Sequence, residues 1–391
     1  MTDDTLKQEM SKYLGPFEKA LAAEDFDLAN RISMLAAERL LKRSGGAARE
    51  ILWKKIFSKL RAGYVTQYQC RDFEIVDYKM YPLLQGSPLF RGPQPEAVDL
   101  AAGRYITVMG AAQLFGRFQQ TGPHTAIGNA LGLSAINLSL GGAGPETFSR
   151  YKFLKVANGG QAAILQILSG RSIGCDEYPG GRRTVRPGGT RKVARLTVLK
   201  EIWDQSPAEA KRLVAKWQAR YVKTMLGLIR RIKVPVILTW ISSRTPDSWS
   251  IERMNKDKDF GDFPHLVERR MLDKIAAKTA GLIEVSHDPG LPHGFNSYLT
   301  GRKCPRVMKN GSLCWDNEYY PSKEASEAMV SQIVEALKKV VVIPPPVIVD
   351  EEIPAPPPKK KTKARRRLQK RKTRVRLQSV NGTDRGPAKL T

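Results

Sequence analysis

Cysteine is scarce in this chain of 391 residues, and long apolar runs are missing. The four cysteines form no CxxC pair, the spacing from which zinc sites usually take ligands, so we expect no metal site. We expect Cys304 and Cys314 to be reduced thiols rather than a disulfide. No apolar run reaches the roughly 18–20 residues that span a bilayer. The start, MTDDTLKQEM, is acidic and polar, without the basic start and apolar stretch of a signal peptide, so we expect a cytoplasmic protein.

The chain also lacks a glycine-rich phosphate loop. After the apolar run "YITVM" comes "GAAQLFG", Gly110 to Gly116, which fits neither GxGxxG nor GxxxxGK[ST]. Phe115 occupies the second glycine position of the latter pattern, and no Lys-Ser/Thr pair follows. We therefore expect no nucleotide and no other cofactor.

Acidic residues are absent from 359–376, a stretch whose twelve Lys and Arg residues contribute +12 of the net charge of +27. The proline-rich segment 343–358 before it predicts an extended linker. Residues 359–391 are too charged to fold alone and are expected to be a disordered tail. Such a tail suits nucleic acid or another polyanion, without base stacking because no aromatic residue interleaves the charges; a merely solubilising tail is the alternative. The residues expected to bind the polyanion are the basic ones of 359–376: Lys359, Lys360, Lys361, Lys363, Arg365, Arg366, Arg367, Lys370, Arg371, Lys372, Arg374 and Arg376.

The first 65 residues have the apolar spacing of amphipathic helices. Leu6, Met10, Tyr13, Phe17 and Leu21 recur at steps of three and four residues, which places them on one helix face. Similar patterns predict further helices near residues 28–35 and 51–60. We expect residues 1–65 to be a helical extension whose helices pack on each other, on the main domain or on a second copy.

Residues 66–342 alternate short apolar runs with helical patterns, which predicts one α/β domain. Near-continuous apolar runs are typical of parallel strands covered on both faces. The expectation is a flavodoxin-like, doubly wound, five-stranded parallel sheet, with the site at the carboxyl ends of the strands. Expected strands are 105–110, 134–142, 161–170, 234–243 and 281–287; expected helices are 207–233, opened by Ser206 and Pro207, 264–280 and 322–339; insertions are 173–205 and 288–320.

The segments that follow these strands resemble the blocks of the SGNH (GDSL-like) hydrolase superfamily. That family has a GDS turn, a glycine block, a GxN block and a DxxH block before the last helix. Its members hydrolyse esters with a serine nucleophile and a histidine base. On this chain the GDS turn falls on Gly110–Gly116, so the nucleophile position is Ala112. The glycine block falls on Gly141 or Gly142.

The GxN and DxxH blocks also lack the asparagine and the histidine for which the superfamily is named. Ser172 stands where the resemblance puts the asparagine. Asn317 and Tyr320 stand where it puts the acid and the histidine, and Pro321-Ser322 matches the entry to the last helix. The segments "SPLFRGPQP", "GAAQLFGRF", "NLSLGGAGPETF" and "QILSGRS" are similar to a bacterial domain family of unknown function, seen mainly in alphaproteobacteria. That resemblance covers roughly residues 75–335 and implies an SGNH-like fold without an established reaction.

Chemically, these replacements argue against hydrolysis by the parent mechanism. Alanine cannot form an acyl-enzyme, and a neutral tyrosine is a poor base near pH 7. Ligand binding remains feasible because backbone N–H groups, an amide and a cation would still converge. The candidate ligand-binding residues are Ala112, Gln113, Gly141, Gly142, Arg171, Ser172 and Tyr320.

Histidines and acids near these positions leave alternatives open. Gln113 binds either a ligand or neighbouring backbone, and Arg171 binds either a ligand or Asp176 or Glu146. A displaced catalytic set would use Ser172 with His287 or Tyr320. His124 is expected in a turn and His265 in a capping or surface position.

Three function hypotheses follow. The leading one is a degenerate, non-hydrolytic domain that binds a small polar or carbohydrate-like ligand or a protein partner, with a tail that binds a polyanion. The second is a hydrolase or transferase acting on sugar or acyl groups through rearranged residues. The third is a structural or assembly protein that acts through residues 1–65.

Overall fold

The computed structural model describes most of the central chain and part of the N-terminal extension. The expected tail, nearly all of the expected linker and the expected third N-terminal helix lie outside the described residues. Described are residues 3–23, 28, 32, 35, 39, 75–83, 90–173, 184–185, 193–256, 260–287, 294–296, 301, 303, 306–307, 313–317 and 319–343.

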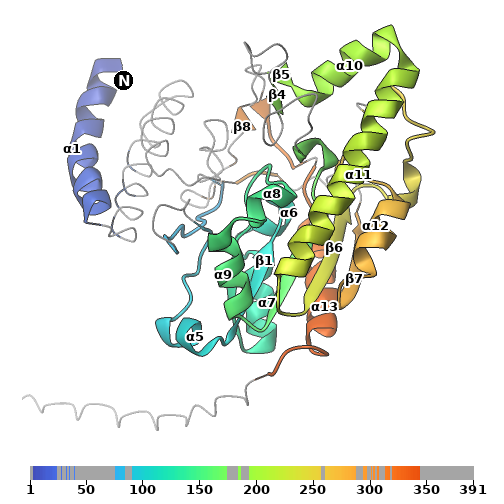
Figure 1. Cartoon of the computed structure of the whole chain (residues 1–391). Helices are drawn as coiled ribbons and strands as arrows, with labels where there is room; N and C mark the ends of the chain where they lie inside the picture. Colours follow the sequence, from blue (N-terminus) through green and yellow to red (C-terminus); the bar gives the residue numbers. More distant parts are fainter. Residues whose placement is uncertain are drawn as a thin grey trace, which may run out of the picture. The chain divides into compact units, whose positions relative to one another are not determined.

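Five parallel strands form the central sheet, in the order β2-β1-β3-β6-β7 (Figure 1). Counted along the chain, this order is 2-1-3-4-5, which is the order of flavodoxin-like doubly wound sheets. The predicted fold class and all five predicted strands are therefore confirmed. The strands are β1 (Tyr105–Met109), β2 (Ser134–Asn137), β3 (Ala162–Gln166), β6 (Val236–Ser242) and β7 (Gly281–Ser286).

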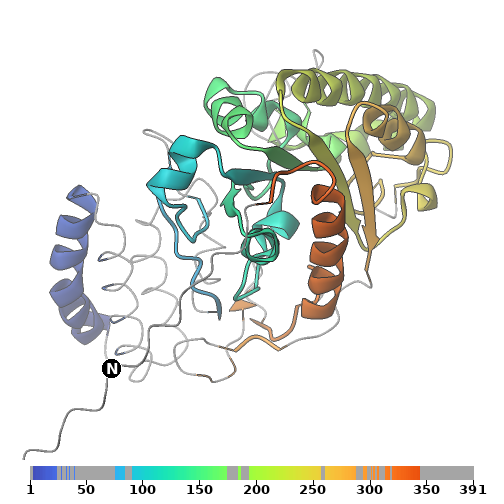
Figure 2. The same ribbon diagram turned by 90° about the horizontal axis from the view of Figure 1, so that it is seen from below.

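Helices cover both faces of this sheet. Successive strand residues point to opposite faces, and accordingly Ile164 and Leu165 belong to two different hydrophobic clusters. Each cluster joins the sheet to one layer of helices; Figure 2 shows the two layers on opposite sides of the strands. The first layer is α7 (Pro123–Leu131) and α13 (Lys323–Leu337), and the second is α8 (Pro145–Phe148), α9 (Tyr151–Gly159), α11 (Pro207–Arg231) and α12 (Arg269–Ala276).

Burial differs between inner and outer strands. β1, β3 and β6 are buried at every residue, as their apolar runs predicted. β7 is mostly half-buried or exposed, although its sequence is also largely apolar. It is an edge strand, with a neighbouring strand on one side only, so the prediction of burial on both faces is wrong for β7.

Two predicted helix starts are confirmed by their caps. The Ser206 hydroxyl accepts a hydrogen bond from the N–H of Glu209, and Pro207 occupies the first turn of α11. The Ser322 hydroxyl accepts from the N–H of Ala325 at the start of α13.

Other boundaries differ from the predictions. α12 begins at Arg269 rather than at 264, because Leu266 has a φ of 63° and interrupts any helix before it. The insertion 173–205 ends in helix α10 (Arg195–Gln205), which was not predicted. The remaining short elements are α5 (Ala97–Ala102), α6 (Ala112–Phe115), β4 (Thr184–Val185), β5 (Val193–Ala194), β8 (Arg306–Val307), β9 (Leu313–Cys314) and the 3-10 turns 170–172 and 246–248.

The start of the N-terminal extension is helical. α1 (Asp3–Ala22) includes the predicted apolar face, on which Phe17 is buried and Tyr13 is half-buried. Among the described residues, no helix is long and apolar enough to cross a membrane.

Candidate functional site

The turn from Gly110 to Gly116 leaves β1 at the carboxyl edge of the sheet, where a doubly wound fold places its site. The Gln166 side chain, at the end of β3, holds the start of this turn. Its Oε1 accepts from the N–H of Ala111 at 2.8 Å, and its Nε2 donates to Oε1 of Gln113 at 3.3 Å. A Cβ at Gly110 would lie 2.6 Å from the same Oε1. Gln113 is therefore bound to a side chain of β3, and Ala112 beside it is buried.

A buried arginine holds the other end of the turn. Arg91 is 1% exposed, and its guanidinium donates to the carbonyl oxygens of Phe115, Gly116, Gln119 and Gln120. Gly116 has a φ of 75°, and a Cβ there would lie 2.8 Å from Nη1 of Arg91. The second glycine of "GAAQLFG" is thus required by the backbone and by the arginine that approaches it.

His124 is neutral, and it hydrogen-bonds both the segment that carries Arg91 and the end of β2. Its Nε2 lies 3.0 Å from the carbonyl oxygen of Gly92, so Nε2 carries the proton, while Nδ1 accepts from the Asn137 amide at 3.0 Å. Burial and the positive charge of Arg91 lower the pKa of His124 to about 3. His124 is fully buried at the start of α7, so its expected place in a turn is wrong. Hydrogen bonds thus connect the three segments "FRGP", "QLFG" and "NLSL" around the end of the β1 turn.

Arg117 and Tyr320 meet beside the turn, although they are 203 residues apart in the sequence. The Arg117 guanidinium donates to the Tyr320 hydroxyl at 2.8 Å and lies over that ring at 5.1 Å from its centroid. The hydroxyl oxygen accepts this bond, so its proton remains available to a ligand. Asn317 does not orient the hydroxyl, as the resemblance implied, but binds the N–H and the carbonyl oxygen of Tyr320.

The end of β3 carries a serine, an arginine and a histidine in contact. Nδ1 of His265 lies 3.0 Å from Oγ of Ser169, and Nε2 lies 3.4 Å from Nη1 of Arg171. Because a guanidinium only donates, Nε2 is the acceptor and the proton sits on Nδ1, which donates to Ser169. Burial, Arg171 and Arg244 lower the pKa of His265 to about 3. His265 is neutral and partly buried, so the expected capping or surface position is wrong.

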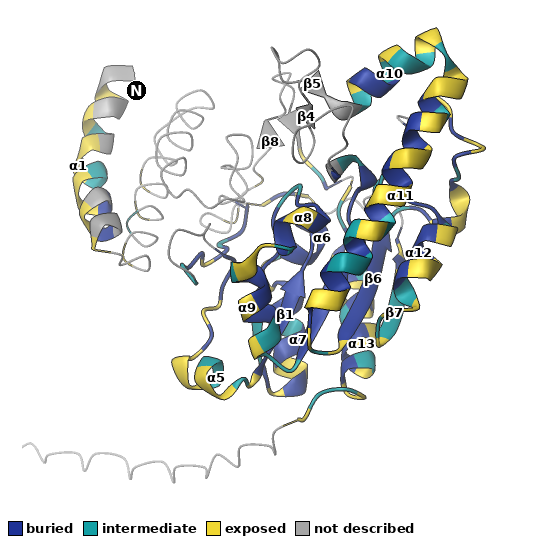
Figure 3. Ribbon diagram, viewed as in Figure 1, coloured by how far each residue is buried: buried dark blue, intermediate teal, exposed yellow. Residues whose placement is uncertain are grey.

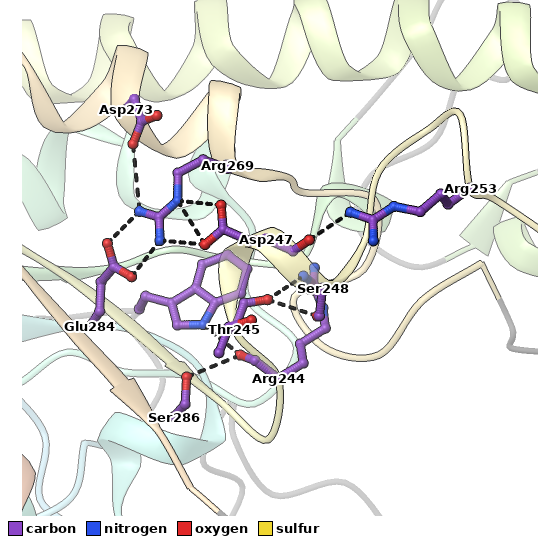
Figure 4. A network of polar contacts seen from close by, with 10 residues as sticks. Arg244, Thr245, Asp247, Ser248, Arg253, Arg269, Asp273, Glu284 and Ser286 are labelled. Carbon is purple, nitrogen blue, oxygen red and sulfur yellow. Dashed lines mark hydrogen bonds and ion pairs between the residues drawn. The ribbon is translucent and has the colours of Figure 1, made fainter.

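Arg244 holds the loop that carries His265. It stacks on Trp240, with 4.8 Å to the ring centroid, and donates to the carbonyl oxygens of Thr245, Asp262, Pro264 and Val267. Burial lowers its pKa to about 10, against the opposing charge of Asp262. Figure 4 shows Arg244 next to a second network, in which Arg269 binds Asp247 and Glu284.

Tyr319 is a partly exposed neighbour of Tyr320. Its ring lies 5.0 Å from that of Tyr320, centroid to centroid, and the residue is 45% exposed. Burial of the hydroxyl raises the pKa of Tyr319, while the positive charge of Arg171 lowers it. Tyr319 thus contacts Tyr320 and lies within range of the charge of Arg171.

The other predicted residues are spread more widely. Gly141 and Gly142 follow β2 and are half-buried, and Gly142 has a φ of 70°. Ser172 lies in the 3-10 turn 170–172, and its side chain is outside the described part, as is Asp176. His287 follows β7 and lines a separate hollow of about 420 Å³ with Ser322 and the start of α13. Ser172 follows β3 and His287 follows β7. Because β6 lies between these two strands, the axes of β3 and β7 are about 9–10 Å apart.

Sequence reasoning missed the buried arginines and the pair Ser169–His265. Arg91, Arg117 and Arg244 are each at most 9% exposed. Arg91 lies in "LFRGP", part of the segment "SPLFRGPQP" that carries the family resemblance. A cation among apolar residues there is a signal that the arginine is buried and hydrogen-bonded. Among the described residues, no group of three His, Cys, Asp or Glu side chains is placed to hold a metal ion.

The order of the five parallel strands defines an α/β protein of the doubly wound class. The chain belongs to the family described as "Domain of unknown function (DUF6473)", which it matches over residues 67–178 and 195–302. No curated protein matches the chain. The matched ranges contain the β1 turn, Arg91, Gln166, Arg171 and His265.

Solved structures similar to the chain are hydrolases of low identity. Phospholipase A1 from Streptomyces albidoflavus is 8% identical, with a TM-score of 0.34 over 61% of this chain and 100% of that one. The acetyl xylan esterase Est2A from Butyrivibrio proteoclasticus is 8% identical, with a TM-score of 0.31 over 65% and 67%. A Slackia heliotrinireducens protein assigned to the SGNH hydrolases is 11% identical, with a TM-score of 0.30 over 60% and 99%. Such values carry no argument about activity.

Proposed function

We propose that the α/β domain binds a small anionic ligand, such as an acidic sugar, without hydrolysing it. The observation that carries this proposal is Arg171 beside a neutral His265 at the carboxyl edge. Arg171 and Arg244 both act on His265, which indicates a positive potential there. The Tyr320 hydroxyl adds a donor, and the exposed Tyr319 adds an aromatic surface.

The chemistry of the same residues argues against hydrolysis. Ala112 has no nucleophile at the β1 turn. A general base must accept the proton of its serine, whereas Nδ1 of His265 donates to Ser169. A histidine whose pKa is about 3 is also a poor base near pH 7.

Thermal unfolding with small ligands tests the proposal. We expect glucuronate, but not glucose, to raise the melting temperature, because only glucuronate has a carboxylate for a guanidinium. The effect is expected to vanish in Arg171→Met and to persist in Arg104→Met, in which an exposed arginine is removed. An equal response of the two variants to glucuronate would refute the assignment of Arg171.

A second candidate is hydrolysis by Ser169 and His265, favoured by their 3.0 Å contact. With p-nitrophenyl acetate, the binding proposal expects the native chain and Ser169→Ala to release nitrophenol at the same rate. Turnover that Ser169→Ala abolishes would establish the hydrolase instead. Glucuronate binding and ester turnover are separate readouts, so each candidate can fail independently.

The basic tail is proposed to bind a polyanion. Support comes from the charge density of 359–376, which lies outside the described residues. Deleting 359–391 is expected to weaken DNA binding strongly at 0.15 M salt, because the counterion release of up to fourteen basic groups, twelve of them in 359–376, is lost. Unchanged affinity after the deletion would refute it.

A further inference from the structure

The long helix α11 carries a row of positively charged residues along its outer side. Figure 3 shows this side exposed along the helix, while the opposite side is buried. Glu209 is the only acidic residue of the helix, and it pairs with Arg212 in the first turns. Beyond this pair, all exposed charges are positive. We call this set the α11 stripe: Lys216, Arg220, Lys223, Arg230, Arg231 and, just after the helix, Lys233.

Neighbouring helices extend the positive surface. Asn158 of α9 binds the carbonyl oxygen of Arg231 and the N–H of Lys233, which fixes α9 beside the end of the stripe. Lys155 on α9 and Lys274 on α12 are exposed as well. Exposed acids on flanking helices are Glu146 on α8, Glu201 and Asp204 on α10, and Asp273 on α12; Asp204 is in an ion pair with Lys256 and Asp273 with Arg269.

We propose that the α11 stripe binds the phosphate backbone of double-stranded DNA. From Lys216 to Arg231 the stripe spans about 22 Å at 1.5 Å per residue. Duplex DNA carries one negative charge per about 1.7 Å of its axis, and its major groove is about 12 Å wide. The stripe is thus long enough to contact phosphates on both sides of a groove. Binding releases counterions and reads no sequence.

Composition of the outer side favours the duplex over other polyanions. Trp217 and Tyr221 are buried, so α11 offers no exposed aromatic ring on which unpaired bases would stack. Between the charges the exposed residues are alanines, Ala215 and Ala219, and an anionic membrane usually requires a large apolar face as well. The surface belongs to the folded domain and is separate from the basic tail.

The test compares two triple variants of the full chain. Lys216→Ala/Arg220→Ala/Lys223→Ala removes three charges from the stripe. Lys323→Ala/Lys338→Ala/Lys339→Ala, called the α13 variant, removes three exposed charges from α13 and the turn just after it, on the opposite layer. Fluorescence anisotropy with a 30-base-pair duplex measures affinity between 0.05 and 0.3 M salt. Circular dichroism and thermal melting verify that each variant is folded.

We expect the stripe variant to reduce the slope of log K against log salt by about 2–3, since each phosphate contact contributes about 0.9. Its affinity at 0.15 M salt should fall at least tenfold. In the α13 variant, the change in the slope and the change in log K at 0.15 M salt should each be at most a third of those in the stripe variant. Lys216→Arg/Arg220→Lys/Lys223→Arg, which keeps the charges, should restore binding.

Three results would overturn the proposal. Equal losses in the stripe and α13 variants would mean that only net charge matters. No loss in the stripe variant would assign DNA binding to the tail alone. A stripe variant that loses affinity for phosphatidylserine vesicles, but not for the duplex, would assign the surface to membranes.

Discussion

Replacing Arg91 with methionine removes the group that holds the end of the β1 turn. Its guanidinium donates to four carbonyl oxygens and lies 4.9 Å from the centroid of the Tyr78 ring. The bonds to Phe115 and Gly116 are buried, whereas those to Gln119 and Gln120 are partly accessible to water. Methionine fills much of the same volume but satisfies none of these oxygens.

The expected loss follows from these environments. An unsatisfied buried acceptor costs about 1–3 kcal/mol, and one that water reaches costs less. Removing the buried charge returns part of this, since a guanidinium is itself expensive to desolvate. The net loss of unfolding free energy is expected to be about 3–5 kcal/mol. At about 2.1 cal/mol/K per residue over roughly 270 residues, 4 kcal/mol corresponds to about 7 °C in melting temperature.

Urea unfolding followed by tryptophan fluorescence, together with thermal melting, measures this loss. Arg104→Met is the matched control, because Arg104 pairs with Asp99 at the surface and should cost at most about 1 kcal/mol. Arg91→Lys should lose most of the same free energy, since an ammonium cannot reach four carbonyl oxygens with the geometry of a fork. A loss below about 1 kcal/mol in Arg91→Met would refute the reasoning.

Three further predictions concern glycine, pH and capping. Gly116→Ala should destabilise by about 2–4 kcal/mol, because φ is 75° and a Cβ would lie 2.5 Å from Pro123 Cδ, whereas Gly227→Ala in α11, with nothing within 4 Å, should stabilise by about 0.5–1 kcal/mol. Stability should fall as the pH drops from 6.5 toward 3: the pKa of His265 is lowered to about 3, so only the unfolded chain takes up its proton, at about 2 kcal/mol by pH 5. His124, whose pKa is also lowered to about 3, adds a similar dependence, so His265→Gln should about halve the histidine part of the slope between pH 7 and 5, and an unchanged slope in urea unfolding would contradict the assigned neutral form. Ser206→Ala should cost about 1 kcal/mol by loss of the cap on Glu209, measured by thermal melting.

Local sequence patterns were sufficient for the sheet and the major helix starts. Apolar runs predicted all five strands, and Ser206, Pro207 and Ser322 predicted where α11 and α13 begin. These features depend on neighbours within about four residues, which periodicity and capping rules describe. The absence of a nucleophile at Ala112 is likewise legible from the sequence alone.

Tertiary structure alone decided what surrounds that position. The contact of Arg117 with Tyr320 joins residues 203 apart, and that of Ser169 with His265 joins residues 96 apart. Neither arises from local periodicity, because assembly of the parallel sheet brings these segments to one edge. The protonated nitrogen of His265 also depends on its neighbours, since Arg171 can only donate. The sequence by itself determined the scaffold and the missing serine, and packing decided which polar groups face one another at the edge.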